Sequence, residues 1–346
     1  MRRGLVIVIA VPALAAAMLS CLLSLDLGEL TRDHGLDSGL DSMLDDASDD
    51  AETDVVDIPA HCFDKKLGEG ETDLDCGDTC PRCTIGKKCN AGSDCLSGNC
   101  IGGRCVECPA GMVRVRIVTG AVPIVYCIDE TEISVASYEL FSTAVTPATA
   151  KNPLPAPCNV AAKTSFVAGY PSGADAGAAL PVRYVDWCDA FAYCDWAGKR
   201  LCGQIGGKTN PYDRPNDPSS GQWRRACSVD KGSVDASVWP YGASPNGELC
   251  QTRDRDTGVA DAPPTAPVES GSLSGCKGAS SELNAPLFDQ SGNVAEWEDS
   301  CSPSYVTCWV RGGSFRTPSA QASCAASEAK APLTRSDAIG FRCCKP

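Results

Sequence analysis

This chain of 346 residues has only two histidines and carries no net positive charge. The two histidines, His34 and His61, both precede the C-terminal two thirds of the chain, which excludes a histidine-based metal site or catalytic dyad there. The formal net charge is −14. Because binding to phosphates requires a positively charged face, nucleic acid is not expected as a partner.

Cysteine, in contrast, is abundant, with 23 in the chain. Thiols in the cytosol stay reduced, so cytosolic proteins seldom keep so many cysteines. Zinc sites are a poor alternative, because the two histidines could complete few of them. The composition therefore predicts disulfide bonds and an extracytoplasmic location.

The N-terminal hydrophobic run is too short to span a membrane. It covers residues 5–19 and follows a basic start, which is typical of a secretory signal. The run ends in Met-Leu-Ser-Cys at residues 18–21, which resembles the bacterial lipobox. We predict that residues 1–20 are a lipoprotein signal peptide and that Cys21 is acylated.

An ordinary signal peptide is the alternative, and it would leave Cys21 as one more disulfide partner. Parity favours the lipobox, because removing Cys21 from the 23 cysteines leaves an even number that can all pair. Acyl chains would make the membrane a partner of the protein. The expected location is the cell envelope, lipid-anchored at the outer membrane or cell surface of a Gram-negative bacterium.

Residues 21–60 are strongly acidic. Between residues 22 and 60 there are twelve Asp or Glu residues, a single basic residue, Arg32, and no aromatic residue. Like charges repel and little apolar surface is available to bury, which predicts a disordered tether. Calcium binding by Asp-rich repeats is the alternative, but the segment lacks the regular Asp ladder of such repeats.

Residues 61–107 form a predicted disulfide module. The segment has few large apolar residues, so cross-links must substitute for a hydrophobic core. Cys80 and Cys83 form a Cys-x-x-Cys pair, but the βα context of a redox motif and the four ligands of a zinc site are missing. Four bridges are expected, with open connectivity. They would join Cys62, Cys76, Cys80, Cys83, Cys89, Cys95, Cys100 and Cys105.

Regular secondary structure is expected after residue 108. Residues 113–118 alternate apolar and polar side chains as a strand does, and Cys108 and Cys127 flank this segment and are expected to close a hairpin. Ser134 can cap a helix that begins near Val135. The predicted apolar face of this helix contains Tyr138, Leu140, Phe141 and Ala144.

A second helix is predicted within residues 180–202, ending at Gly198. Its predicted buried face contains Trp187, Phe191, Cys194 and Trp196.

A series of short motifs follows along the chain. They are GQWRRACS (221–228), WPYG (239–242), TAPV (265–268), FDQSGNVAEW (288–297), VRGGSF (310–315) and IGFRCC (339–344). In order and spacing they resemble the formylglycine-generating enzyme and sulfatase-modifying-factor family, across roughly residues 109–346. The resemblance implies an α+β fold over residues 108–346. This is a variant C-type-lectin-like fold with sparse regular structure, preceded here by the small disulfide module.

The resemblance also implies specific disulfides. The family's pairings correspond to Cys194 with Cys343 and to Cys227 with Cys324. Long-range bridges of this kind contribute roughly 3–5 kcal/mol each by loop-closure arguments. Cys301 and Cys308, seven residues apart, are expected to close a local loop.

The copper chemistry of the family is not expected here. Formylglycine-generating enzymes bind Cu(I) between two thiolates that follow the Gly-Gly-Ser turn, because soft Cu(I) prefers sulfur. In this chain Thr317 stands at the position of the first copper cysteine. Cys324 matches a structural cysteine, and the second copper cysteine has no counterpart. We therefore assign no catalytic residue.

Calcium is the cofactor that the resemblance does imply, in a structural role. Asp289 and Glu296 supply the matching carboxylates, and Gly292 and Val294 supply the matching carbonyls, all hard oxygen ligands. The alternative is a tight turn that is held without metal by hydrogen bonds of Asn293.

A second family calcium site is less well matched. It would use Gln251, Thr252 and a downstream carboxylate such as Asp261. Gln251 replaces the Asn of the family, which weakens this prediction.

The function implied is a cell-envelope lipoprotein whose domain binds or scaffolds an extracytoplasmic peptide or glycan without turnover. The alternative is an active oxidoreductase of the same superfamily, which modifies a peptide or protein substrate through another cysteine pair. A third possibility is a structural envelope protein in which the cysteine module is the working part. Free thiols near the Gly-Gly-Ser turn would favour the enzyme.

Overall fold

The computed structural model describes residues 58–118, 122–159, 163–170, 177–228, 239–258, 262–278 and 283–346. The predicted signal peptide, Cys21, nearly all of the tether and Asp261 lie outside the described residues. Asp57 to Pro346 form one compact unit, so the cysteine-rich segment (residues 58–107) and the domain after it belong to the same body. Within the described part of the chain, no helix is long and apolar enough to cross a bilayer.

The cysteine-rich segment contains little regular structure. Two short 3-10 helices, Ala60–Phe63 and Gly92–Asp94, precede a small ribbon of β1 (Cys100–Ile101) and β2 (Arg104–Cys105). The core of this segment is made of cysteines. Its four disulfides are Cys62–Cys80, Cys76–Cys83, Cys89–Cys100 and Cys95–Cys105.

The first of two larger sheets has the strand order β3-β4-β12-β5. Strands β3 (Met112–Ile117) and β4 (Ile124–Asp129) form the expected hairpin, and Cys108 is bonded to Cys127 of β4. Strand β12 (Cys343–Lys345) lies antiparallel between β4 and β5 (Arg200–Leu201).

The second sheet has the order β10-β9-β8-β11. Strands β8 (Ala295–Cys301), β9 (Cys308–Arg311) and β10 (Ser327–Lys330) form an antiparallel meander, and β11 (Ile339–Phe341) pairs parallel with β8. A separate ribbon is formed by β6 (Lys277–Gly278) and β7 (Leu287–Phe288).

One residue, Arg342, links the two sheets. It stands between β11 of the second sheet and β12 of the first, and it is fully buried. Its guanidinium donates to the backbone oxygens of Asp129 and Phe288 at 3.1 and 2.8 Å. The C-terminal chain therefore crosses between sheets at a buried positive charge.

Helix α1 (Val135–Ala144) begins as predicted, with the Ser134 hydroxyl accepting from the Ser137 amide at 3.3 Å. Tyr138 and Phe141 are buried, but the predicted face is wrong for two residues. Leu140 is 67% exposed and Ala144 is also exposed. The apolar face continues through Val145 instead, because aromatic packing sets the rotation of the helix.

Helix α2 (Trp187–Trp196) is capped by Asp186, whose carboxylate accepts from the Asp189 amide while its own amide donates to the Asp189 carboxylate. The chain leaves the helix at Gly198, whose φ of +68° suits the left-handed conformation of a helix end. Trp196 is 39% exposed, so its predicted burial is only partial. A third helix, α3 (Gln222–Cys227), is shorter.

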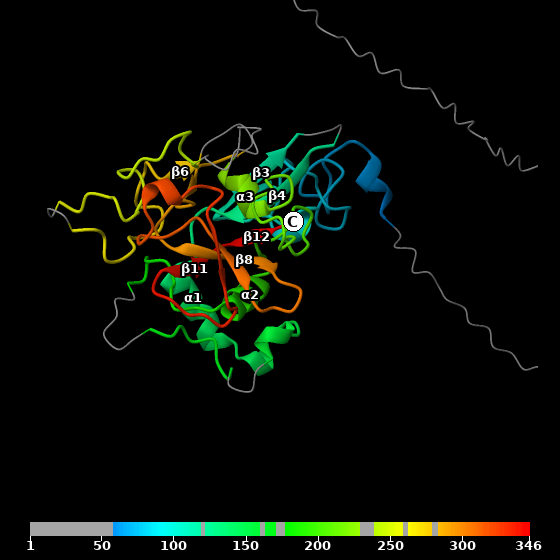
Figure 1. Cartoon of the computed structure of the whole chain (residues 1–346). Helices are drawn as coiled ribbons and strands as arrows, with labels where there is room; N and C mark the ends of the chain where they lie inside the picture. Colours follow the sequence, from blue (N-terminus) through cyan, green and yellow to red (C-terminus); the bar gives the residue numbers. More distant parts are fainter. Residues whose placement is uncertain are drawn as a thin grey trace, which may run out of the picture. The chain divides into compact units, whose positions relative to one another are not determined.

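Two hydrophobic clusters form the interior of the domain. One joins α1 and α2 to β8, β9 and β11, with Trp187 and Trp297 fully buried. The other joins β3 and β4 to α3 and contains Trp223. Figure 1 shows α1 and α2 near β8 and β11, and α3 near β3 and β4.

The domain disulfides connect distant parts of the chain. The structure pairs Cys194 with Cys343 and Cys227 with Cys324, as the family resemblance implies, and it pairs Cys301 with Cys308. The sequence left three further pairs open. They are Cys158–Cys188, Cys202–Cys344 and Cys250–Cys276.

Candidate functional site

The Gly-Gly-Ser turn follows β9 and forms a tight loop. Gly313 has a φ of +69°, and a Cβ at this position would lie 2.9 Å from the Thr317 Cγ2 atom, so glycine is required. The Ser314 amide donates to the Thr317 hydroxyl at 3.0 Å, and the Thr317 amide donates to the Ser314 carbonyl at 2.8 Å. Thr317 therefore stabilises the turn in which the family places a copper thiolate.

The sulfur chemistry around this turn does not fit Cu(I). All cysteines from Cys62 to Cys344 are joined in eleven disulfides, including Cys324 with Cys227. A bonded sulfur is not a thiolate, and only the thiolate binds metal. Within the described part of the chain there is therefore no two-thiolate donor set beside Thr317.

A cleft of about 520 Å³ adjoins the turn. Apolar residues of the second sheet line it, among them Ala295, Val310 and Ile339. Serine and threonine residues, including Ser314 and Thr317, also line it, and no aromatic residue is among the described residues that line it.

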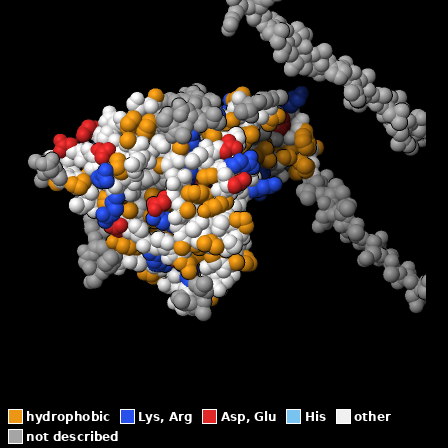
Figure 2. Space-filling model, viewed as in Figure 1, with side chains coloured by type: hydrophobic (Ala, Val, Ile, Leu, Met, Phe, Trp, Pro, Cys, Tyr) orange, Lys and Arg blue, Asp and Glu red, His pale blue; other side chains and the backbone are white. Residues whose placement is uncertain are grey.

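Two ion pairs lie at the cleft. Arg316 pairs with Asp337, and Lys330 of β10 pairs with Glu328 of the same strand. The Arg316 and Glu328 side chains are mostly exposed, so their ends can exchange partners at little cost. Figure 2 shows acidic and basic side chains in small mixed groups on one face of the molecule, with no large area of a single sign.

The predicted calcium ligand Glu296 is already engaged. Its Oε2 atom accepts from Arg342 Nε at 2.6 Å and from Trp223 Nε1 at 2.8 Å, and its Oε1 atom accepts from Arg342 Nη2 at 2.8 Å. A carboxylate neutralised in this way is a poor ligand for a cation. Glu296 therefore does not fit the role that the resemblance implies.

The other predicted carboxylate, Asp289, fits better. Its Oδ2 atom accepts from the Gly271 amide at 2.6 Å, whereas its buried Oδ1 atom has no hydrogen-bond partner. Glu132, a residue that the sequence reasoning missed, resembles it. Asn293 Nδ2 donates to Glu132 Oε1 at 3.0 Å, and Glu132 Oε2 is buried without a partner.

Burial raises the pKa of Asp289 to about 6. Burial also raises the pKa of Glu132 well above its usual range, and the nearby charge of Asp289 raises it further. Arg342 opposes both shifts. Burial therefore disfavours the ionised form of both carboxylates.

Two of the three residues proposed for a second calcium site are buried, Gln251 and Thr252. Gln251 Nε2 donates to the Ala266 carbonyl at 2.9 Å, and the backbone carbonyl of Gln251 accepts from the backbone amide of Asn293 at 2.7 Å. Thr252 is also buried, and its hydroxyl has no partner among the described residues. Asp261, the expected carboxylate, lies outside the described residues.

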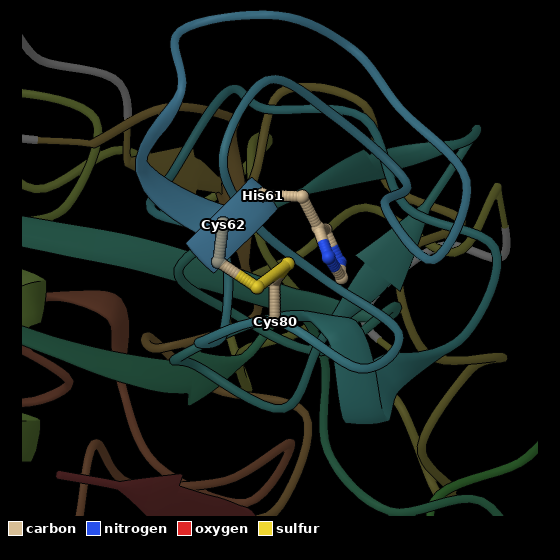
Figure 3. Close-up of side chains that lie close together, drawn as sticks. All are labelled: His61, Cys62 and Cys80. Carbon is tan, nitrogen blue, oxygen red and sulfur yellow. A yellow bond between two sulfur atoms is a disulfide. The ribbon is translucent and has the colours of Figure 1, made fainter. Parts of the chain in front are cut away.

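A histidine and two cysteines cluster in the cysteine-rich segment. Figure 3 shows the imidazole of His61 beside Cys62 and Cys80, and one ligand atom from each residue lies within 4.8 Å of the others. The two sulfurs are bonded to each other, however. Cys83 of the Cys-x-x-Cys pair is bonded to Cys76, so this pair is not a redox disulfide.

The fold and the site define an α+β domain with extensive disulfides and a cleft beside a Gly-Gly-Ser turn, where the described cysteines are all joined in disulfides. Residues 121–346 match the sulfatase-modifying factor enzyme 1-like domain. Because this match covers well over half of the chain, the protein belongs to that family.

Two curated mouse (Mus musculus) proteins are similar in sequence. The formylglycine-generating enzyme is 27% identical over 189 residues, covering 47% of this chain and 43% of the relative. The inactive C-alpha-formylglycine-generating enzyme 2 is 28% identical over 185 residues, covering 51% and 52%. This chain thus spans about half the length of the curated relatives that it matches.

Solved structures show a more distant likeness. CarF is 19% identical with a TM-score of 0.43, covering 69% of this chain and 98% of that protein. PvdO from Pseudomonas aeruginosa is 16% identical with a TM-score of 0.37, covering 68% and 91%.

Proposed function

We propose that the domain binds an extended peptide of an extracytoplasmic protein in the cleft beside Thr317, without chemical turnover. The observation that carries this proposal is a cleft of about 520 Å³ at a turn whose donor set cannot hold Cu(I). The inactive mouse relative is consistent with a family that retains the fold without the oxidase reaction.

A peptide fits the cleft better than a glycan does. Sugar rings pack their apolar faces on aromatic side chains, and no aromatic residue lines the cleft in the described part of the chain. Hydroxyl groups and two exchangeable ion pairs suit a peptide, because it carries backbone amides and charged side chains.

The edge of the second sheet supports an extended peptide conformation. Strand β10 lies at the end of the strand order, and Ala326 O accepts from the Gly312 amide on the β9 side. Backbone groups alternate along a strand, so those of Ser327 and Ala329 point away from β9, towards the open edge. An added peptide strand could pair with them while its side chains enter the cleft.

The test begins with a phage-displayed library of random decapeptides selected on the purified protein. Fluorescence anisotropy then measures the affinity of a selected peptide for the wild type and for two variants. Ser336→Trp narrows the cleft, and Ala329→Pro removes an edge amide; each should weaken binding at least tenfold. The matched control Ser142→Trp, on α1, should bind as the wild type does.

Selection of no peptide, or equal affinity of the cleft variants, would contradict peptide binding. Binding to a glycan array instead, with loss in Ser336→Trp, would assign the cleft to sugars. The oxidoreductase alternative is tested separately by thiol titration of the denatured protein. A pair of free thiols that maps near Thr317 would revive that alternative, because it requires a reduced cysteine pair.

We also propose that the protein is a lipoprotein of the cell envelope, anchored through Cys21 at the outer membrane or cell surface. The lipobox-like sequence at residues 18–21 supports this. Metabolic labelling with radioactive palmitate should tag the wild type but not Cys21→Ala. An unlabelled wild-type protein would rule out the anchor.

A further inference from the structure

Three potential metal ligands lie together at the start of the cysteine-rich segment. They belong to His61 and Cys62, which are neighbours in the first 3-10 helix, and to Cys80 (Figure 3). One ligand atom from each residue lies within 4.8 Å of the others. Cys62 is fully buried and Cys80 is 8% exposed. Their disulfide masks two of the three ligands, because only a thiolate sulfur binds metal.

The imidazole of His61 has an unsatisfied nitrogen. Its Nε2 atom is buried and has no hydrogen-bond partner among the described residues. The chain passes close to this nitrogen at Gly70, where a Cβ would lie 3.4 Å from it. A buried polar atom without a partner costs free energy, and a metal ion is a partner that neutral imidazole readily accepts. An ion held by the two sulfurs would supply that partner.

A carboxylate also faces the bridge. Glu71 Oε1 lies 3.7 Å from Cys80 Sγ, although a bonded sulfur has no proton to donate to it. The other oxygen, Oε2, accepts from the Gly68 amide at 3.1 Å, which orients the carboxylate. A thiolate and a carboxylate on one tetrahedral zinc ion lie about 3.5 Å apart, given Zn–S and Zn–O bonds of about 2.3 and 2.0 Å. Glu71 is therefore within reach of an ion bound by Cys80.

We propose that reduction of the Cys62–Cys80 bridge opens a zinc site, with His61 as the third ligand and Glu71 as the fourth. The reductant is a dithiol. Its two S–H groups give up two electrons and two protons and form an S–S bond, while the protein bridge breaks and each of its sulfurs takes one proton. Zinc then displaces both protons. Two thiolates, one imidazole nitrogen and one carboxylate oxygen form a tetrahedral set that suits zinc.

A second group of sulfurs in the segment lacks these properties. Cys89, Cys95 and Cys105 also have ligand atoms within 4.8 Å of one another. Their sulfurs belong to two bridges, Cys89–Cys100 and Cys95–Cys105, so both bridges would have to break to free them. No imidazole belongs to this group. Of the two groups in the described part of the chain, only the one at His61 gains both thiolates from a single bridge.

The test measures reduction of the purified wild-type protein with and without zinc. A mixture of reduced and oxidised dithiothreitol sets the redox conditions, and a metal buffer fixes the free zinc concentration. Zinc at ten times its dissociation constant should lower the ratio of reduced to oxidised dithiothreitol that half-reduces Cys62–Cys80 at least tenfold, because zinc binds only the reduced form. Cys89–Cys100, in the same segment, is the matched control and should not respond to zinc.

The freed thiols are located by adding a chelator, alkylating the protein and analysing its peptides by mass spectrometry. The reduced protein should retain one zinc ion per chain after gel filtration, and the oxidised protein none. His61→Phe and Glu71→Gln should each weaken zinc binding at least tenfold. Glu69→Gln, an exposed neighbour in the sequence, should bind zinc as the wild type does.

A further measurement does not depend on variants that fold. X-ray absorption of the zinc-loaded wild type should show two sulfur ligands at about 2.3 Å and nitrogen or oxygen ligands at about 2.0 Å. Equal zinc binding by the oxidised protein, or alkylated thiols at cysteines other than Cys62 and Cys80, would overturn the site. The same holds if zinc leaves the reduction of this bridge unchanged.

Discussion

The cysteine-rich segment, residues 58–107, and the domain that follows it use disulfides in different ways. In the segment, the four bridges join cysteines 7 to 18 residues apart, and the cysteines themselves are the core. In the domain, Cys194–Cys343 closes 149 residues around a core of buried tryptophans and other aromatic side chains. Cross-links therefore replace hydrophobic burial in one region and reinforce it in the other.

The largest expected effect comes from removing bridges in each region. Replacing the cysteines of both Cys194–Cys343 and Cys202–Cys344 by Ala should destabilise the domain by roughly 5 kcal/mol, because either bridge alone keeps nearly the same long loop closed and the cost of an open chain grows with loop length. Cys76→Ala with Cys83→Ala opens a much shorter loop, worth roughly 2 kcal/mol by the same reasoning. Chemical denaturation measures the change in unfolding free energy of the domain variant.

Cys76→Ala with Cys83→Ala should nevertheless loosen the cysteine-rich segment, because the core of this segment is made of cysteines. Hydrogen exchange should show loss of protection confined to residues 58–107, with the domain unchanged. Loss of protection throughout the chain would contradict the difference between the regions.

The next effect concerns large apolar side chains. Trp187, the first residue of α2, is fully buried, and its indole nitrogen donates to the Glu298 carbonyl at 3.0 Å. Trp187→Ala should cost about 3–5 kcal/mol of unfolding free energy. Phe63 in the cysteine-rich segment is 64% exposed, so Phe63→Ala should change stability by less than about 0.5 kcal/mol. Urea denaturation measures both changes in unfolding free energy. Equal changes for Trp187→Ala and Phe63→Ala would contradict the exposed position of Phe63.

The smallest expected effect is a pH dependence of opposite sign in the two regions. In the cysteine-rich segment, hydrogen bonds from the Asn90 and Ala91 amides lower the pKa of Asp94. In the domain, burial raises the pKa of Glu298 to about 7, against the opposing charge of Arg311. Asp94 is therefore stabilising when ionised, whereas Glu298 is stabilising when protonated.

The contribution of Asp94 should be present above its ordinary pKa near 4 and be lost as the pH falls further. The contribution of Glu298 should be complete below pH 4 and be lost as the pH rises to about 7. The melting temperature should be measured between pH 3 and 8 for the wild type and both variants. Asp94→Asn should reduce the change of melting temperature at acid pH, and Glu298→Gln should reduce the change towards neutral pH. A change in the same pH range in both variants would contradict the opposite pH dependence of the two regions.

Local features were predictable because they depend on nearby residues. Ser134 before an apolar run predicted the start of α1, and Gly198 predicted the end of α2, since caps act within one helical turn. The family motifs identified the domain, and with it two long-range disulfides. Thr317 at the copper position was also visible in the sequence alone.

The rotation of α1, which exposes Leu140, could not be predicted, because it depends on Tyr138 and Phe141 packing against the aromatic rings of α2 and β11. The partner of Glu296 could not be predicted either. Arg342 is 46 residues away, and only the crossing of the C-terminal chain between two sheets brings them together. Sequence alone determined the family, the helix ends and the missing thiolate. Tertiary structure decided which buried charges neutralise each other, because that depends on distances between groups far apart along the chain.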